Sequence, residues 1–181
     1  MIIDCISDLH GHFPKLEGGD LLLIAGDLTA SDTHAEYVKF YSWLHMQPYN
    51  HYIFIAGNHD NLLQIDEGAS GYLSDTTYLC DSGTEFEYEQ QIPHPDSTEH
   101  VSIDCLFFEK RKLKIWGSPW VKSFKGMNPN CQAFTLKTEE EIKAKFALIP
   151  SDTDILITHS PPYGIMDLGY GSKSLYKLLY S

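Results

Sequence analysis

The stretch Leu21-Leu22-Leu23-Ile24-Ala25-Gly26-Asp27 combines an uninterrupted apolar run with a glycine and a carboxylate directly after it. Such a run is typical of a parallel strand that is buried on both faces. Open α/β sheets bind their ligands outside the carboxyl ends of these strands. The stretch therefore predicts an α/β fold with Asp27 at the functional edge of its sheet.

Two further apolar runs indicate that this strand has neighbours along the chain. Ile2 to Ile6 precede it and Tyr52 to Ala56 follow it, with a helical pattern between the second and third runs. Thr33 and Glu36 form a capping box, so the helix is expected to begin just after Asp32. Alternating strands and helices are typical of β-α-β units.

The middle of the chain shows a different pattern, which predicts a second and more antiparallel sheet. Strands are expected at residues 77–80, 101–108 and 113–116. The charged residues 109–112 are interpreted as a turn between the last two strands. The polar residues 82–100, which include two prolines, are interpreted as a surface excursion.

The last part of the chain returns to helical and strand patterns. Thr138 and Glu141 form a second capping box, which predicts a helix from there to about Leu148. Residues 154–158 form a short β-branched run that predicts a strand, and the leucine spacing after Ser172 predicts a final helix.

The composition is that of a globular protein, with 43% hydrophobic and 21% charged residues and a formal net charge of −12. This acidic balance disfavours non-specific binding to nucleic acid. The first apolar run is too short for a signal peptide or a membrane span, and the four cysteines show no Cys-x-x-Cys spacing. We expect one domain over residues 1–181, in the cytoplasm, with reduced and mostly buried thiols, and no membrane partner.

Side chains with metal-binding atoms follow four of the predicted strands. They are Asp8 and His10, then Asp27, then Asn58, His59 and Asp60, and finally His159. Each segment has an ordinary alternative, because aspartate, asparagine and glycine are common in turns and a lone histidine is usually solvated. Turns do not explain His59 or the repetition at four strand ends. The pattern therefore favours a metal site.

The mixture of carboxylate, amide oxygen and imidazole donors suits Mn, Fe or Zn, and the scarcity of thiols argues against a structural zinc ion. Pairs of such ions hydrolyse phosphate esters by activating water and binding the attacking and leaving oxygens. We therefore expect two divalent metal ions, with Mn as the first choice, and a small phosphate ester as the substrate.

At these segments the sequence resembles the calcineurin-like metallophosphoesterase superfamily, whose blocks are D-x-H, G-D, G-N-H-[DE], H and G-H-x-H. The first four blocks match in order and spacing. Residues 55–59, 116–120 and 158–164 are similar to the metallophosphoesterase-domain-containing branch. The resemblance implies a four-layer α/β/β/α sandwich of two mixed sheets, with the metals at the strand ends between them.

The resemblance also implies a role for each matching residue. Asp8 and His10 would bind the first metal ion, Asp27 would bridge both ions, and Asn58 and His159 would bind the second.

His59 is implied to be catalytic, because the matching histidine of the family contacts the phosphate and protonates the leaving oxygen. A neighbouring acid assists it, and Asp60 matches that position. Residues 116–120 would lie near the mouth of the site, where an aromatic side chain stacks on a nucleotide base. The alternative is that these tryptophans pack in the core.

No Gly-His-x-His block follows His159 in the sequence. From this we expect weaker metal binding and reduced activity, with His12 as the nearest spare imidazole, although a solvated loop histidine is the more ordinary interpretation. We also expect an exposed sheet edge that a second copy or another partner covers. The alternative function is a nucleotide-binding or partner-binding regulatory module that keeps the fold without catalysis.

Overall fold

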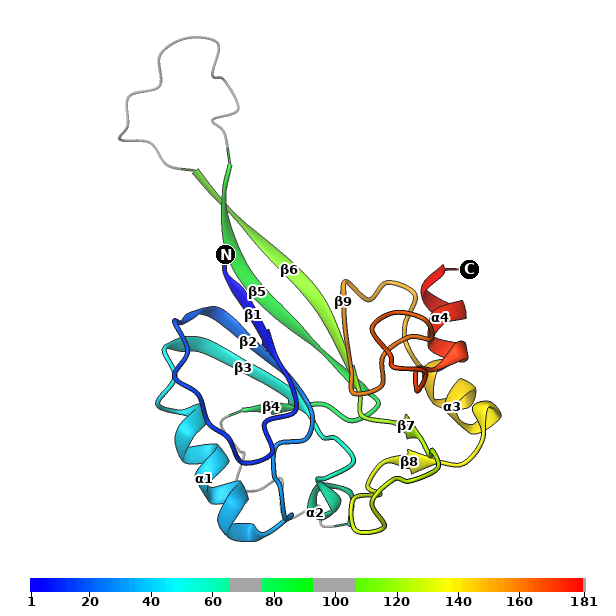
Figure 1. Cartoon of the computed structure of the whole chain (residues 1–181). Helices are drawn as coiled ribbons and strands as arrows, with labels where there is room; N and C mark the ends of the chain where they lie inside the picture. The colour runs from blue at the N-terminus through cyan, green and yellow to red at the C-terminus, as the bar shows by residue number, and fades with distance from the viewer. Residues whose placement is uncertain (66–75, 93–106, 181) are drawn as a thin grey trace.

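Two sheets form the centre of the computed structural model, which describes residues 1–65, 76–92 and 107–180 (Figure 1). The first sheet is parallel throughout and has the order β1-β2-β3-β4. Its strands are β1 (Ile3–Ile6), β2 (Gly19–Ala25), β3 (Tyr49–Ile55) and β4 (Thr77–Tyr78). β2 lies inside the sheet with Leu21, Leu22 and Ile24 fully buried. The prediction from the apolar run is confirmed.

The second sheet has the order β5-β6-β9 and is mixed. Its strands are β5 (Ser82–Ile92), β6 (Phe107–Ser118) and β9 (Ile155–Thr158). β5 and β6 are antiparallel, whereas β6 and β9 are parallel. A small separate ribbon pairs β7 (Val121–Lys122) with β8 (Thr135–Leu136).

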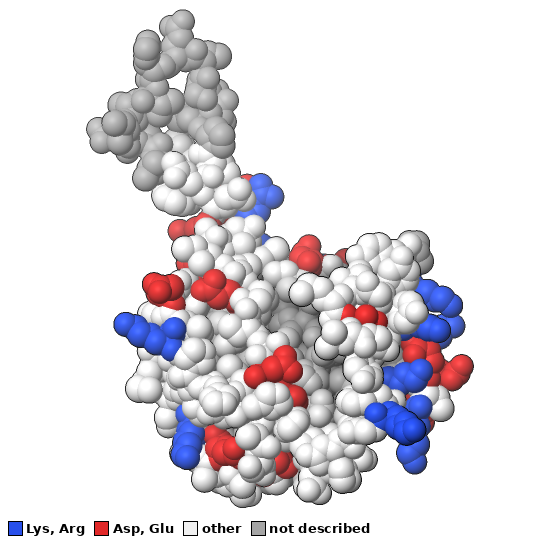
Figure 2. All heavy atoms as spheres, viewed as in Figure 1, with Lys and Arg blue, Asp and Glu red and all other residues white. Residues whose placement is uncertain are grey.

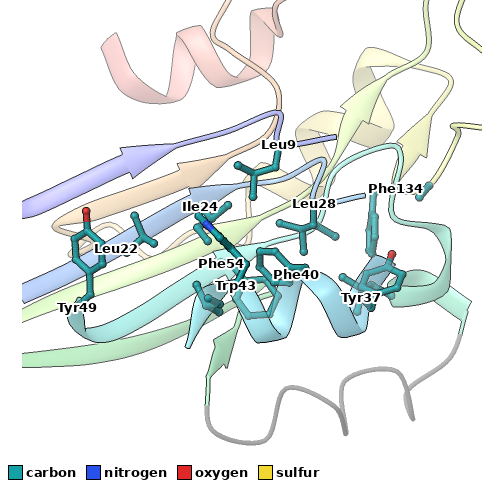
Figure 3. Close-up of a cluster of buried hydrophobic side chains, with 14 residues drawn as sticks. Leu9, Leu22, Ile24, Leu28, Tyr37, Phe40, Trp43, Tyr49, Phe54 and Phe134 are labelled. Atoms are coloured by element: carbon teal, nitrogen blue, oxygen red, sulfur yellow. The ribbon is translucent and has the colours of Figure 1, made fainter. Parts of the chain in front are cut away.

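Alternating side chains let the first sheet serve two cores. Leu21, Leu23, Ile53 and Ile55 face the second sheet, in a cluster that includes Ile115 and Ile157 of that sheet. The even-numbered residues of the first sheet face α1 (His34–Leu44), in a cluster that includes Leu22, Ile24, Phe40, Trp43 and Phe54 (Figure 3). The two sheets therefore pack face to face, with α1 outside the first.

Two helices cover the outer face of the second sheet. α3 (Glu139–Phe146) and α4 (Lys173–Tyr180) meet through Ile142, Phe146 and Leu175, and Leu156 of β9 packs against them. The layers are thus helix, sheet, sheet and helix (Figure 1). The α/β/β/α sandwich that the resemblance implied is confirmed.

Both predicted capping boxes are present. The Thr33 hydroxyl accepts a hydrogen bond from Glu36 N at 3.3 Å, and the Thr138 hydroxyl accepts one from Glu141 N at 3.2 Å. A short helix, α2 (Asn61–Ile65), was not predicted, because five residues are too few to show a helical period.

The expected excursion at residues 82–100 and the expected turn at 109–112 are wrong where the structure describes them. Residues 82–92 and 107–118 form one long antiparallel hairpin, while residues 93–106 lie outside the described part. Three glutamates of β5 lie directly opposite lysines of β6: Glu85 opposite Lys114, Glu87 opposite Lys112, and Glu89 opposite Lys110. Opposite charges at paired positions favour strand pairing even where the residues have low strand propensity.

No helix in the described part is long and apolar enough to cross a membrane. Three of the four cysteines are described, and Cys5, Cys80 and Cys131 are all free thiols. Cys131 is buried as expected, whereas Cys5 is exposed.

Candidate metal centre

The predicted ligand residues come from the carboxyl ends of β1, β2, β3 and β9 and meet around Asp27. One oxygen of its carboxylate, Oδ2, lies 3.6 Å from His10 Nε2 and 3.9 Å from His59 Nε2. The other oxygen, Oδ1, lies 3.3 Å from His159 Nε2. Asp27 thus separates two groups of donors, one on each carboxylate oxygen.

The first group, on the Oδ2 side, contains His10, Asp27 and His59. The second group, on the Oδ1 side, contains Asp8, Asp27 and His159. Within each group the ligand atoms lie within 4.8 Å of one another. Asn58 belongs with the second group, since its Oδ1 lies 3.2 Å from His159 Nε2. The resemblance implies that Asp8 binds the first ion with His10, and the structure places Asp8 within reach of Asp27 and His159 as well, so the ion that Asp8 binds stays a prediction.

The backbone at the strand ends is shaped to hold these side chains. Asp8, His10 and Asp27 all have positive φ angles, of 53°, 44° and 53°, which residues with a Cβ rarely adopt. Asp8 N donates to Gly26 O at 3.0 Å, and His10 N donates to Asp27 O at 2.9 Å, so the two loops hold each other. These bonds hold Asp8, His10 and Asp27 together at the same edge of the sheet.

Two glycines are needed because the loops approach so closely. A Cβ on Gly57 would lie 2.2 Å from Asp27 Oδ1, and a Cβ on Gly26 would lie 2.6 Å from His159 Nδ1. Both values are shorter than any non-bonded contact, so a larger residue would displace a ligand.

Asp27 and His159 stabilise each other's charged forms. Burial alone would raise the pKa of Asp27, but hydrogen bonding and charge from His159 outweigh it and lower that pKa. Burial alone would lower the pKa of His159, but the Asp27 carboxylate raises it to about 9. The buried carboxylate therefore requires a positive charge beside it, and a cation among these donors would take over the role of the His159 proton.

His59 has a fixed ring orientation. Its Nδ1 lies 3.3 Å from the carbonyl oxygen of Ala30 and 3.4 Å from the thiol of Cys131. A carbonyl can only accept, so the proton is assigned to Nδ1, and Nε2 faces Asp27. The ring also meets His10 edge-on, with centroids 4.5 Å apart.

The carboxylate of Asp60 points away from His59 and into the protein, where it is fully buried. Oδ2 accepts hydrogen bonds from Gly57 N at 2.8 Å and Leu28 N at 3.1 Å, and Oδ1 accepts from Thr29 N at 3.1 Å and Thr29 Oγ1 at 3.0 Å. In the structure the Nδ1 atom of His59 faces Ala30 and Cys131 rather than Asp60, and the assisting role of Asp60 stays a prediction. Asp60 ties the loop after β2 to the loop after β3.

The sequence reasoning missed Cys131, which holds two of the predicted residues. Its carbonyl oxygen accepts a hydrogen bond from Asn58 Nδ2 at 3.2 Å, so the amide oxygen of Asn58 faces His159. Its thiol contacts the His59 ring, as described above. No sequence signal marks this residue, because it lies 72 positions from His59 in an irregular loop.

The remaining candidates lie outside the centre. His12 is exposed and belongs to neither donor group among the described residues. Trp120 packs against Phe134, donates its indole N–H to Asp81 at 2.7 Å, and lies under Lys145, so it matches the core alternative. Trp116 lies close against Gly83, and its indole N–H is buried.

Comparisons with known proteins agree with this geometry. A family model described as calcineurin-like phosphoesterase matches residues 1–180. The chain is 32% identical over 170 residues to metallophosphoesterase domain-containing protein 1 of Homo sapiens, covering 90% of this chain and 49% of that protein. It is 30% identical over 190 residues to a UPF0046 protein of Caenorhabditis elegans, covering 93% of this chain and 57% of the relative.

A third similarity is to a probable rhamnogalacturonate lyase C of Emericella nidulans, at 35% identity over 170 residues. It covers 92% of this chain but only 14% of that protein. The chain therefore spans about half the length of the first two relatives and a small part of the third.

Proposed function

The chain belongs to the calcineurin-like phosphoesterase family, and from that premise we propose that it hydrolyses small phosphomonoesters or phosphodiesters, nucleotides among them, with two divalent cations. The observation that carries the proposal is the buried Asp27 carboxylate, whose two oxygens face two separate groups of donors. A bridging carboxylate of this kind is what a pair of neighbouring cations requires.

The donor spacing fits cations of the proposed class. Two ligand atoms that share one ion at about 2.1 Å lie roughly 3.0 to 3.4 Å apart. Asp27 Oδ1 and His159 Nε2 are 3.3 Å apart, and His159 Nε2 and Asn58 Oδ1 are 3.2 Å apart. Mn is proposed first, with Fe and Zn as alternatives, because the donors are oxygens and imidazoles. When bound, the two cations supply the positive charge that lets water attack a phosphate ester.

The chain's own residues have separate roles in the proposed hydrolysis. Asp27 and Asp8 keep the centre anionic, and Asn58 adds a neutral oxygen whose direction Cys131 fixes. We assign proton transfer to His59 rather than metal binding, because its Nε2 is the more distant of the two imidazole nitrogens on Oδ2, at 3.9 Å. With Nδ1–H directed at Ala30 O, Nε2 is the atom that can hold and release the proton.

This assignment predicts that the two ions bind unequally. Once His59 is set aside, the first group retains His10 and Asp27, whereas the second has Asp8, Asp27, Asn58 and His159. We therefore expect one tightly bound and one weakly bound ion, and turnover that is low until the weaker position fills.

The test combines metal analysis with hydrolysis of bis-p-nitrophenyl phosphate in protein reconstituted with manganese. We expect two ions per chain and turnover in the parent protein, loss of both in Asp27→Ala, and loss of turnover with metal content retained in His59→Ala. His12→Ala serves as the matched control, because that histidine is exposed and outside both groups.

Turnover that survives Asp27→Ala would contradict the proposal. If the parent protein binds ions without turnover, the regulatory module becomes the better description. If His59→Ala loses an ion together with turnover, His59 is a ligand and the proton must come from elsewhere.

A second copy of the chain is proposed to cover α4. Leu178 and Leu179 on this helix are 40% and 48% exposed, and β9 pairs with β6 alone among the described strands. Apolar helix faces and open strand edges are typical of interfaces. Light scattering at micromolar concentration is expected to show a dimer that Leu179→Glu disrupts, whereas a monomeric parent protein would exclude it.

A further inference from the structure

A pocket of about 390 Å³ opens beyond the carboxyl ends of β6 and β9. Its walls include three aromatic residues and three charged ones: Phe124, Tyr163 and Tyr170, with Lys122, Glu139 and Lys173. We propose that this pocket binds an aromatic group that carries a negative charge. We further propose that the pocket holds the part of the phosphate ester that does not react, and this step rests on the proposed function.

The pocket lies close to the metal centre along the chain. Thr158 of β9 is paired with Ser118 of β6, so the two strands end side by side. His159 follows Thr158, and Tyr163 lies four residues beyond His159, while Lys122 lies four residues beyond Ser118. Four residues span at most about 14 Å. Tyr163 therefore lies within about 14 Å of His159, and this is the distance over which we propose that an ester bound at Asp27 and His159 extends its ring.

The aromatic walls are held ready for a planar ligand. The rings of Phe124 and Tyr170 have centroids 4.6 Å apart at 45°, and Lys173 Nζ lies 5.2 Å from the centre of the Tyr163 ring. Phe124, Tyr163 and Tyr170 are nevertheless 42%, 46% and 54% exposed. Large aromatic surface left open around a cavity is typical of ligand sites.

Charge in the pocket selects for an anion. No ion pair joins Lys173 to another residue in the described part of the chain. Lys122 lies 3.3 Å from Glu139, whose carboxylate also accepts hydrogen bonds from Ser172 Oγ and Ser174 N at 3.0 and 2.7 Å. The one acid in the pocket is thus already engaged, and a cation remains available beside the aromatic rings.

The part of the sequence that forms most of the pocket, residues 107–181, has more basic than acidic residues. Residues 107–181 contain 11 of the 13 Lys and Arg residues but only 7 of the 25 Asp and Glu residues. Lysine side chains gather on the side of the molecule that holds α3 and α4 (Figure 2). In a chain with a net charge of −12, this is the side that an anionic ligand can approach.

The loop that carries both tyrosines is rigidly tied. Asp167 accepts hydrogen bonds from Gly164 N, Gly169 N and Gly171 N at 2.8, 3.1 and 3.2 Å. Tyr163 N donates to Ser172 O at 3.0 Å, which joins the two ends of the loop. A ligand would therefore lose little free energy to ordering this wall.

The first experiment excludes the metal centre by working in excess chelator. Binding of 2-naphthalenesulfonate is measured by titration calorimetry, with the uncharged 2-naphthalenesulfonamide as comparison. We expect one saturable site for the sulfonate, weaker binding of the sulfonamide, and a loss of about threefold to tenfold in affinity in Lys173→Gln and Tyr163→Leu.

Lys177→Gln is the matched control, because Lys177 lies on the same helix but lines a separate pocket between α3 and α4. The Lys177→Gln variant is expected to bind 2-naphthalenesulfonate as tightly as the parent protein does. Absence of saturable binding, or a loss in Lys177→Gln equal to that in Lys173→Gln, overturns the proposal.

The second experiment tests the assignment to the substrate in the manganese form. Lys173→Gln is expected to raise KM for 6-sulfo-1-naphthyl phosphate, whose ring carries its own negative charge, about threefold to tenfold with kcat unchanged, and to leave KM for methyl phosphate unchanged. If Lys173→Gln leaves KM for the naphthyl ester unchanged, the assignment of the pocket to the substrate is overturned. If no ester is hydrolysed, the proposed function fails while the calorimetric result still decides whether the pocket binds an aromatic anion.

Discussion

The metal centre and the aromatic pocket arise from the same strand ends, yet they are built in opposite ways. Asp27 is 4% exposed, and its loop is fixed by neighbouring loops and by two buried cores. The pocket at Tyr163 and Lys173 is open and lies on loops and the start of a helix. The difference indicates that the position of the proposed chemistry is set by the packing of the sheets, whereas the proposed choice of ligand depends on loops that can vary without disturbing the fold.

The sharpest test of this comparison replaces one residue from each region. Asp27→Asn is expected to reduce turnover on every ester by at least about a hundredfold, because it removes the charge that both donor groups share. Lys173→Gln is expected to affect aromatic anions only. Steady-state kinetics on an aromatic and an alkyl ester measures both, and an equal effect of Lys173→Gln on the two esters would remove the distinction.

A buried residue of the centre is expected to matter for folding as well as activity. Asp60→Ala leaves four donors around an empty position, so the free energy of unfolding is expected to fall by about 3 kcal/mol or more. Urea unfolding in chelator measures this without any contribution from bound metal. Asp60→Asn keeps the shape and should lose less, and an unchanged midpoint in Asp60→Ala would show that the network is not needed.

Cys131 tests whether the contacts beside His59 affect chemistry. Cys131→Val retains the backbone carbonyl that holds Asn58 but removes the thiol near His59 Nδ1. We expect kcat to fall about tenfold with metal content unchanged, and Cys131→Ser to recover part of the loss. The pH profile of kcat is the second measurement, because a merely structural defect would lower the whole profile without shifting it.

In the pocket region, Glu139 is expected to give a small and pH-dependent contribution. Burial raises its pKa, but hydrogen bonds from Ser174, Ser172 and Lys122 outweigh burial and lower it. A carboxylate whose pKa is lower in the folded state stabilises that state above its unfolded pKa of about 4.3, and this contribution is lost as the pH falls through the folded value.

Glu139→Gln should therefore lower the free energy of unfolding by about 1 kcal/mol near pH 7. The two proteins should converge as the pH falls below about 4. Thermal unfolding between pH 3 and pH 7 measures this, and a constant difference across the range would contradict it.

Local patterns made the first sheet and most of the candidate donor residues predictable. The run at residues 21–27, the capping boxes at Thr33 and Thr138, and the aspartate and histidine positions are all visible within a few residues. The β5-β6 hairpin was missed because its stability comes from charge pairs between residues 21 to 29 positions apart, such as Glu89 with Lys110 and Glu85 with Lys114. Glutamate and lysine have low strand propensity, so the local sequence did not predict this hairpin.

The direction of individual side chains could not be predicted from sequence patterns either. Asp60 follows His59 directly, so spacing alone suggested a partnership, whereas the turn sends its carboxylate inward to four donors. Cys131 and Tyr163 come from irregular loops whose closure depends on distant contacts.

The positive φ angles of Asp8, His10 and Asp27 have a consequence for how this protein can change over evolution. Each such angle costs about 1 kcal/mol for a residue with a side chain, and glycine would avoid the cost. A lineage released from the need for metal would therefore gain stability by replacing these residues with glycine. These three side chains thus supply their donor atoms at a cost in folding stability.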